Sequence, residues 1–141
     1  GIDKRKMSKS YGNALDIADD MKTVWDKLRT MTTDPARERR TDPGTPEKCP
    51  VWDLHKFFNK DAQEMSEIHE GCMTAGIGCV DCKKKLMVHL EKMMGPIQER
   101  RAYYEGREDD LKQILESGAA RARAVAEKTM DDVYRVMGLL H

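Results

Sequence analysis

The chain has 141 residues, in which 25 lysines and arginines balance 25 aspartates and glutamates and only 6% of the residues are aromatic. This length accommodates one domain with a modest core and excludes a pair of large domains. The zero net charge argues against a protein that grips nucleic acid with its whole surface. Because the sequence has no long apolar run and no secretory signal pattern, we expect a cytoplasmic protein that does not enter a membrane.

Helical spacing of apolar residues recurs throughout the second half, and strand patterns are nearly absent, so we predict an all-α fold, a helical bundle, although the first half is more broken. The helices predicted in the first half cover residues 21–31, 50–58 and 61–72. Asp19 and Asp20 suit the start of the first of them, and Pro50 suits the first turn of the second. Residues 33–50 are rich in proline and form a predicted loop, in which Pro43–Gly44 suits a type II turn.

The second half continues with amphipathic helices that are punctuated by glycine and proline. The helices predicted there cover residues 86–97, 111–117 and 122–137. Gly95–Pro96 predicts either a kink or a restart of the first of these helices. Ser117–Gly118 predicts a break before the last helix, and Gly138 suits the position after its C-terminus.

A basic loop near the N-terminus, with the sequence KMSKS at residues 6–10, is the first chemical motif. When a carboxylate attacks the α-phosphate of ATP, the departing pyrophosphate gathers negative charge that ammonium groups on a loop can stabilise. Lys6 and Lys9, three residues apart, fit that task. A frayed basic terminus is the alternative, but a chance match to this pentapeptide is on the order of one in ten thousand.

Four cysteines form the second motif: Cys49, Cys72, Cys79 and Cys82 are separated by 22, 6 and 2 residues. In a compartment that keeps thiols reduced, this pattern favours metal or cluster ligation over disulfides. The glycines between Cys72 and Cys79 let the backbone turn tightly beside a ligand. The spacing leaves three alternatives open: free buried thiols, a four-thiolate zinc site and an iron–sulfur cluster.

The sequence resembles the bacterial tryptophanyl-tRNA synthetases, which belong to class I of the aminoacyl-tRNA synthetases. The resemblance covers nearly the whole chain and is carried by the strings MSKSYGN, RRTDPGTPEKCPVWDLHKFF, EGCMTAGIGCVDCKK, GPIQERRAYYE and RARAVAEKTMDDVYRVMGL. It implies that Lys6 and Lys9 act in catalysis and that Lys6, Ser8, Lys9 and Ser10 bind the phosphates of ATP. It also implies that residues 1–15 end a nucleotide-binding Rossmann domain and that residues 16–141 form a helical, anticodon-binding domain.

The resemblance further implies that the catalytic half lies outside this sequence, because the first class I signature and a glycine-rich nucleotide turn are missing from it. The chain would then be an inactive C-terminal fragment of a tryptophan–tRNA ligase. ATP with magnesium, and tryptophan, would bind mainly to residues before Gly1, and the full-length enzyme would be a homodimer. All four cysteines match a subset of the family that binds a 4Fe-4S cluster, which leaves zinc as the alternative metal.

The implied macromolecular partner is tRNA(Trp), read at its anticodon. Specific RNA recognition favours unstacked bases that meet donors on a rigid support. The residues expected to make these contacts are Arg37, Arg39, Arg40, Asp42, Lys83 and Lys84. We expect the cluster to fix the loop before Cys49, which contains Arg37, Arg39 and Arg40, against the helix that follows Cys82. The alternative from another class is a free-standing iron–sulfur or zinc protein with a redox or structural role, in which the lysine motif is accidental.

Overall fold

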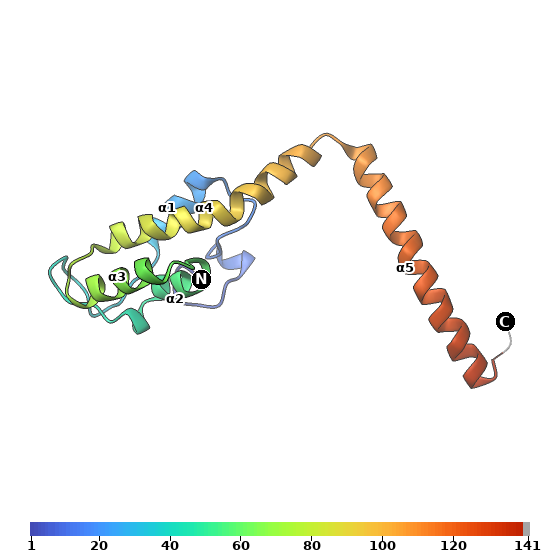
Figure 1. The fold of residues 1–141 in the computed structure, drawn as a ribbon, viewed down its shortest axis with the longest axis horizontal. Coiled ribbons are helices and arrows are strands. Elements are labelled where there is room, and N and C mark those ends of the chain that lie inside the picture. Colours follow the sequence, from blue (N-terminus) through green and yellow to red (C-terminus); the bar gives the residue numbers. More distant parts are fainter. Residues whose placement is uncertain (140–141) are drawn as a thin grey trace. The chain divides into compact units, whose positions relative to one another are not determined.

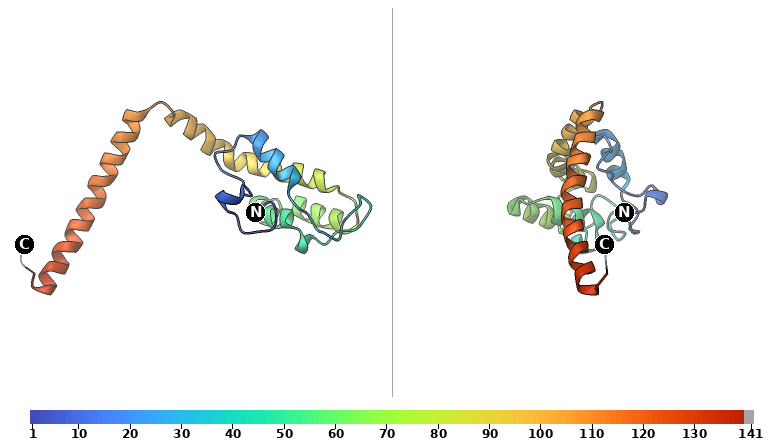
Figure 2. Two further views of the ribbon diagram at one scale, coloured as in Figure 1. Left: turned by 180° about the vertical axis from the view of Figure 1, so that it is seen from behind. Right: turned by 90° about the vertical axis from the view of Figure 1, so that its right-hand side faces the viewer.

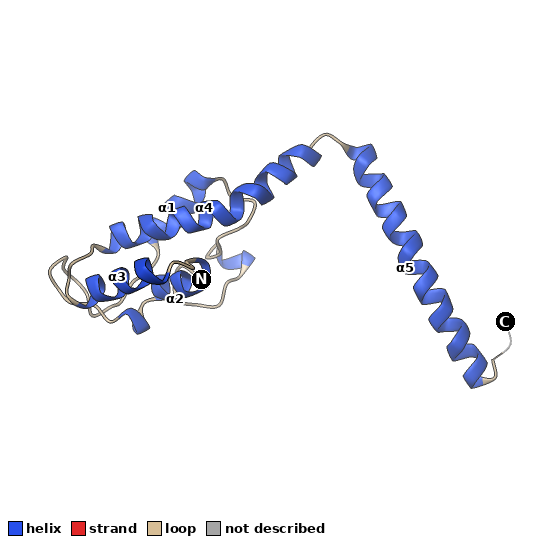
Figure 3. Ribbon diagram, viewed as in Figure 1, coloured by secondary structure: helices blue, strands red, loops and turns tan. Residues whose placement is uncertain are grey.

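The computed structural model describes residues 1–139, and within this range every regular element is a helix (Figures 1 and 3). The α-helices are α1 (Met21–Thr30), α2 (Pro50–Phe58), α3 (Ala62–Met73), α4 (Cys79–Tyr104) and α5 (Glu108–Met137). Two short 3-10 helices, η1 (Lys9–Tyr11) and η2 (Pro46–Lys48), lie in the connecting segments. The predicted all-α fold is therefore confirmed for the described residues.

The chain divides into two compact units, one formed by Gly1–Gln98 and the other beginning at Glu99. In Figures 1 and 2, α1, α2 and α3 lie beside the first part of α4 within the first unit. The second unit consists of the end of α4 and the whole of α5. None of the helices in residues 1–139 combines the length and hydropathy that a bilayer span requires.

One apolar core holds the first unit together, and it is built from single faces of α1, α2 and α4. Its buried side chains are Val24, Leu28, Met31, Val51, Leu86, Leu90 and Met94. Full burial of a leucine contributes about 2 kcal/mol, so packing rather than helix propensity stabilises this unit. Ile2 and Leu15 from the N-terminal segment pack against the same core. The basic loop is thus attached at both ends to the helical unit.

The helix starts in the first half confirm the predicted capping. The carboxylate of Asp20 accepts the backbone N–H of Thr23 at 2.6 Å, and Asp61 accepts those of Gln63 and Glu64 at 3.0 Å. Pro50 occupies the first turn of α2. These contacts satisfy amide groups that a helix N-terminus leaves without intrahelical partners.

The predicted restart at Pro96 and the predicted break at Ser117–Gly118 are wrong, whereas the kink that was the alternative at Gly95–Pro96 stays a prediction. Helix α4 continues through Pro96. The proline has no N–H to donate to the carbonyl of Lys92, but Lys92 is exposed, so water can donate to this carbonyl instead. Helix α5 runs without a break through Ser117–Gly118, where the serine hydroxyl donates to the carbonyl of Ile114 at 3.0 Å. An interior glycine costs only about 1 kcal/mol, which a helix of this length tolerates. The predicted cap at Gly138 is confirmed by its left-handed φ of 68°.

Candidate functional site

The side-chain amide of Asn13 organises the basic loop. Its Nδ2 donates to Asp3 Oδ1 at 2.8 Å and to the carbonyl of Lys6 at 3.2 Å, while its Oδ1 accepts the backbone N–H of Ser8 at 2.8 Å. Asn13 is only 3% exposed. The bond from Asn13 also lowers the pKa of the Asp3 carboxyl. Because one amide joins both sides of the loop, residues 3–13 form a closed, ordered segment.

The predicted phosphate-binding residues all lie on this segment. Lys6, Lys9 and Ser10 are exposed, and Ser8 is half-buried with its hydroxyl 2.8 Å from that of Ser10. Among residues 1–139, no carboxylate forms an ion pair with either lysine. Gly12 ends η1 with a φ of 60°, a conformation that glycine adopts without strain. The loop therefore presents two ammonium groups and two hydroxyls to an incoming anion.

The four cysteines gather in one region of the first unit. Cys49 precedes α2, Cys72 lies in the last turn of α3, and Cys79 and Cys82 occupy the start of α4. All four are half-buried free thiols. Burial and the three neighbouring thiols raise the pKa of Cys82 to about 12, and burial raises the pKa of Cys72, with Cys49 and Cys79 adding to it. Within residues 1–139, no group of three or more potential ligands is arranged around a single metal ion.

Gly44 brings the proline-rich loop against Cys72. Its backbone N–H donates to the carbonyl of Cys72 at 2.9 Å, and a Cβ at this position would lie 2.7 Å from Cys72 Sγ. Only glycine allows this approach. The predicted type II turn at Pro43–Gly44 is wrong, because Gly44 does not adopt the positive φ that this turn requires.

Arg37 faces the thiols rather than the solvent. Its Nη2 donates to the carbonyls of Ile77 at 2.7 Å and Arg40 at 3.1 Å, and its Nη1 lies 3.9 Å from Cys72 Sγ. The side chain is 8% exposed, and its Nε is a buried donor without a partner. The expectation that Arg37 contacts tRNA is therefore corrected, because its guanidinium is inside the protein.

The other three expected tRNA contacts of this loop remain accessible. Arg40 is exposed and donates to the carbonyls of Ala75 and, at 3.1 Å, of Gly76. Arg39 is exposed, and its backbone N–H donates to the half-buried carboxylate of Asp42 at 2.7 Å. Arg37 and Arg40 thus tie the loop to the backbone that separates Cys72 from Cys79.

Lys83 is also buried, with 4% of its surface exposed. Its ammonium donates to the carbonyls of Met31 at 2.6 Å and Arg29 at 2.8 Å, at the C-terminal end of α1. Burial lowers the pKa of Lys83, and the nearby thiols oppose this shift. The expectation that Lys83 lies at the surface and contacts RNA is corrected for this reason. Lys84 is exposed and pairs with Asp81 at 3.4 Å.

Two polar groups near the cysteines were missed by the sequence analysis as site residues. The first is His55, whose Nε2 lies 3.1 Å from the carbonyl of Cys82 and 3.5 Å from its Sγ. His55 is fully buried, its Nδ1 has no partner, and burial lowers its pKa. The only available signal was its spacing of four residues from Val51, which places both on the buried face of α2.

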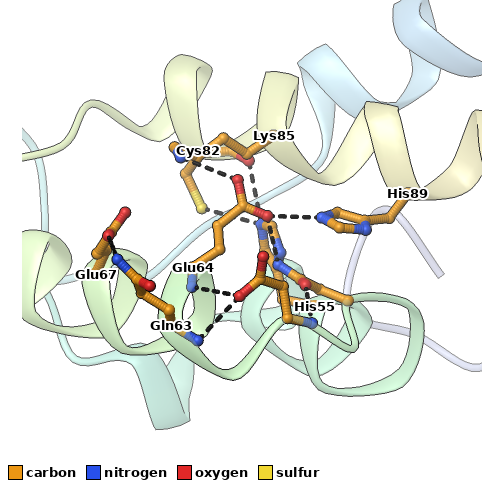
Figure 4. Close-up of polar contacts among 9 residues, drawn as sticks. His55, Gln63, Glu64, Glu67, Cys82, Lys85 and His89 are labelled. Atoms are coloured by element: carbon orange, nitrogen blue, oxygen red, sulfur yellow. Dashed lines mark hydrogen bonds and ion pairs between the residues drawn. The ribbon is translucent and has the colours of Figure 1, made fainter.

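The second group is centred on Glu64 and connects the two helices that contain three of the cysteines (Figure 4). Glu64 on α3 accepts from Lys85 at 2.9 Å and from His89 at 2.7 Å, both on α4, and from Asn59 at 2.9 Å. The bonds from His89 and Lys85 lower the pKa of Glu64 to about 2. Lys85 and His89 lie 21 and 25 residues from Glu64 in the sequence, so no local pattern predicts these two contacts.

Comparison with known proteins assigns the family. Residues 1–95 match the family described as tRNA synthetases class I (W and Y). The chain is 46% identical over 141 residues to the tryptophan–tRNA ligase of Deinococcus radiodurans, covering 99% of this chain and 42% of that protein. It is 44% identical over 139 residues to the ligase of Aquifex aeolicus, covering 99% and 35%. The chain thus spans less than half the length of these curated relatives.

A solved structure agrees with this assignment. The tryptophanyl-tRNA synthetase from Campylobacter jejuni, crystallised with ADP and tryptophan, superposes with a TM-score of 0.81 at 29% identity. The match covers 99% of this chain and 43% of that one. The basic loop, the helical unit and these similarities lead to one assignment: the chain belongs to the class I tRNA synthetases of the tryptophanyl and tyrosyl type.

Proposed function

We propose that this chain is part of a tryptophan–tRNA ligase, to which it contributes the phosphate-binding loop and a helical unit that recognises the anticodon of tRNA(Trp). The observation that supports this function best is the closed basic loop, whose Lys6 and Lys9 are exposed and have no acidic partner in residues 1–139. The full-length ligase acts in the cytoplasm as a homodimer, and residues 1–15 end its nucleotide-binding domain.

The loop acts on the phosphates of magnesium-bound ATP. When the carboxylate of tryptophan attacks the α-phosphate, a new oxygen–phosphorus bond forms and pyrophosphate departs with the bonding electrons. Lys6 and Lys9 stabilise the charge that develops on the departing group, and Ser8 and Ser10 donate hydroxyl hydrogen bonds to it. The Asn13 amide keeps these groups in place before the nucleotide arrives.

Tryptophan-dependent exchange between ATP and pyrophosphate in the full-length enzyme tests this role. The Lys9→Ala variant is expected to exchange about 10²-fold to 10³-fold more slowly, because one transition-state donor is removed. Lys22→Ala, which changes an exposed lysine on α1, serves as the matched control and retains the wild-type rate. Undiminished exchange in Lys9→Ala would exclude the proposed role of the loop.

The helical unit contacts the anticodon through Arg39, Arg40, Asp42 and Lys84, which are accessible beside the cysteines. Arg40 is already fixed by backbone carbonyls, which supports a rigid placement of this surface. Rigid donors beside an RNA loop read base edges with little loss of conformational entropy. Charge removal at Arg39 is therefore expected to weaken tRNA(Trp) binding in the full-length ligase.

We propose that Cys49, Cys72, Cys79 and Cys82 hold a 4Fe-4S cluster, whose core spreads its four ligands apart. Zinc is the alternative, and it would require the thiols to move together, because the described residues place no three ligands around a single ion. The four cysteines are free thiols that lie close enough to raise the pKa of Cys82, and the buried Nε of Arg37, a donor without a partner among the described residues, points to an acceptor near it. The bound group would supply cross-links between the proline-rich loop, α3 and α4. Anaerobically prepared protein is expected to contain about four irons and four sulfides per chain, whereas one zinc without sulfide would contradict the cluster.

A further inference from the structure

Two buried cations lie beside the cysteines, and neither forms an ion pair with a carboxylate of the described residues. Arg37 comes from the proline-rich loop and Lys83 from α4, and both are almost inaccessible to solvent. Among residues 1–139, no carboxylate forms an ion pair with either side chain. Burial of a charge without a counter-charge is strongly unfavourable, so this arrangement requires an anion close by.

The hydrogen bonds of these two side chains do not meet that requirement. Lys83 donates to two backbone carbonyls at the end of α1, and Arg37 donates to two others near the cysteines. Carbonyl oxygens satisfy donors, but they carry no net charge. The Nε of Arg37 lacks even a neutral acceptor, although it is fully buried. Both cations are therefore solvated only in part by the protein itself.

Thiols lie beside both cations, and Lys83 directly follows Cys82 in α4. Nη1 of Arg37 lies 3.9 Å from Cys72 Sγ. The titratable groups that act electrostatically on Lys83 are Cys79, Cys49 and Cys82. The two cations thus approach the same cysteine set from two different segments of the chain.

We propose that Arg37 and Lys83 are built-in counter-ions of a doubly negative tetrathiolate centre. This inference rests on the thiol centre of the proposed function. Four thiolates carry four negative charges, and either a 4Fe-4S core in its usual state or a zinc ion returns two positive charges. Two buried cations balance the remainder. The charges of this region are therefore balanced only when the centre is loaded.

This proposal predicts opposite effects on the two states of the protein. Removal of a counter-ion destabilises the loaded state, because the anionic centre then lacks a neighbouring positive charge. The same change stabilises the metal-free state, because that state then no longer buries a cation without a neighbouring anion. A purely structural role of either side chain predicts instead an equal loss of stability in both states.

The experiment compares Arg37→Met and Lys83→Met with wild-type full-length protein, prepared anaerobically. The rate of metal release to a chelator and the Tm of the loaded and stripped forms are measured. Both variants are expected to release metal about tenfold to a hundredfold faster. Their stripped forms are expected to melt no lower than stripped wild type. Arg37→Lys, which keeps the positive charge, is expected to release metal at a rate close to that of the wild type.

The matched controls are Arg29→Met on α1 and Lys92→Met on α4, since each removes one positive charge from an exposed side chain. Their release rates are expected to stay within about twofold of wild type. Unchanged release in Arg37→Met and Lys83→Met overturns the proposal, as does an equal loss of Tm in loaded and stripped forms or a failure of Arg37→Lys to restore retention. If the wild-type protein contains no metal, the proposed thiol centre is overturned together with the counter-ions. If the wild-type protein contains metal and the variants release it at the wild-type rate, only the counter-ion role is overturned.

Discussion

Asn13 is the residue on which the basic loop depends most directly. Its amide makes three hydrogen bonds across the loop, to Asp3, Lys6 and Ser8, from a nearly inaccessible position. The carboxylate of Asp3 takes part in one of these bonds and also accepts the backbone N–H of Arg5. Placement of the lysines therefore depends on one short side chain that never reaches the phosphates itself.

Replacement of Asn13 by alanine is expected to slow tryptophan-dependent ATP–pyrophosphate exchange in the full-length enzyme by about 10²-fold, because the loop loses its fixed curvature. The KM for tryptophan is expected to stay near the wild-type value, since the amide holds a phosphate loop only. Steady-state exchange kinetics separate the two parameters. A variant with a wild-type maximal rate would show that the loop needs no such support.

Gly44 is a second position where a single atom matters. Gly44→Ala places a Cβ 2.7 Å from Cys72 Sγ and is expected to destabilise the protein by about 1–3 kcal/mol, together with a loss of bound metal. Gly118→Ala is the control: no atom beyond its own helix backbone and its chain neighbours lies within 4 Å of the added Cβ, and the position is inside α5, so it is expected to stabilise by up to about 1 kcal/mol. Urea unfolding and metal analysis measure both effects. Equal behaviour of the two variants would contradict the close approach.

At the scale of elements, the contact between α3 and α4 determines how far apart the cysteines of these helices lie. Glu64 supplies most of the polar part of this contact, through Lys85 and His89 (Figure 4). Both partners and Glu64 itself are partly shielded from water. An ion network in this setting contributes more than an exposed pair.

The Glu64→Gln variant is expected to be less stable by about 2 kcal/mol at pH 7. The pKa of Glu64 is lowered from 4.5 to about 2, so its contribution is complete above about pH 4.5 and is lost as the pH falls toward 2. The difference between wild type and variant should shrink over that range. Urea unfolding at several pH values tests this, with the exposed Glu67→Gln as control. A difference that does not vary with pH would refute the assignment.

The elements also show which parts of the fold the sequence could predict. Asp20, Pro50 and Asp61 act within three residues of themselves, so the starts of α1, α2 and α3 were predicted from local pattern. Pro96 and Gly118 were interpreted as interruptions, because a local rule does not weigh one unfavourable residue against a long helix. The outcome there depends on the whole helix rather than on the dipeptide.

Burial of charged side chains lay beyond such rules. Arg37 and Lys83 stand in basic strings that favour a solvated surface, and their partners are 40 and 52 residues away. Lysine and arginine are rarely fully buried, so composition predicts the opposite of what is found. The set of four cysteines was identified from spacing, whereas the cations around it emerged only from tertiary contacts.

At the scale of the whole molecule, the cysteine centre and the anticodon surface are expected to act together. Cys82→Ser in the full-length ligase removes one thiolate and is expected to lose the bound metal. Binding to tRNA(Trp) is expected to weaken about tenfold, because two or three basic side chains must then be ordered on binding at about 0.5–1.5 kcal/mol each. Filter binding with wild-type and anticodon-altered tRNA measures this. Full affinity in a folded, metal-free variant would separate the two functions.

The packing of Ile2 and Leu15 has a practical consequence for anyone who shortens the gene. A chain that starts at residue 16, at the expected boundary of the nucleotide-binding domain, would lack two apolar side chains that pack against the core of the first unit, so part of that core would be exposed to water. The truncated protein is expected to aggregate at concentrations at which the longer protein stays in solution. The helical unit and the basic loop should therefore be expressed together, with any start codon placed upstream of Ile2.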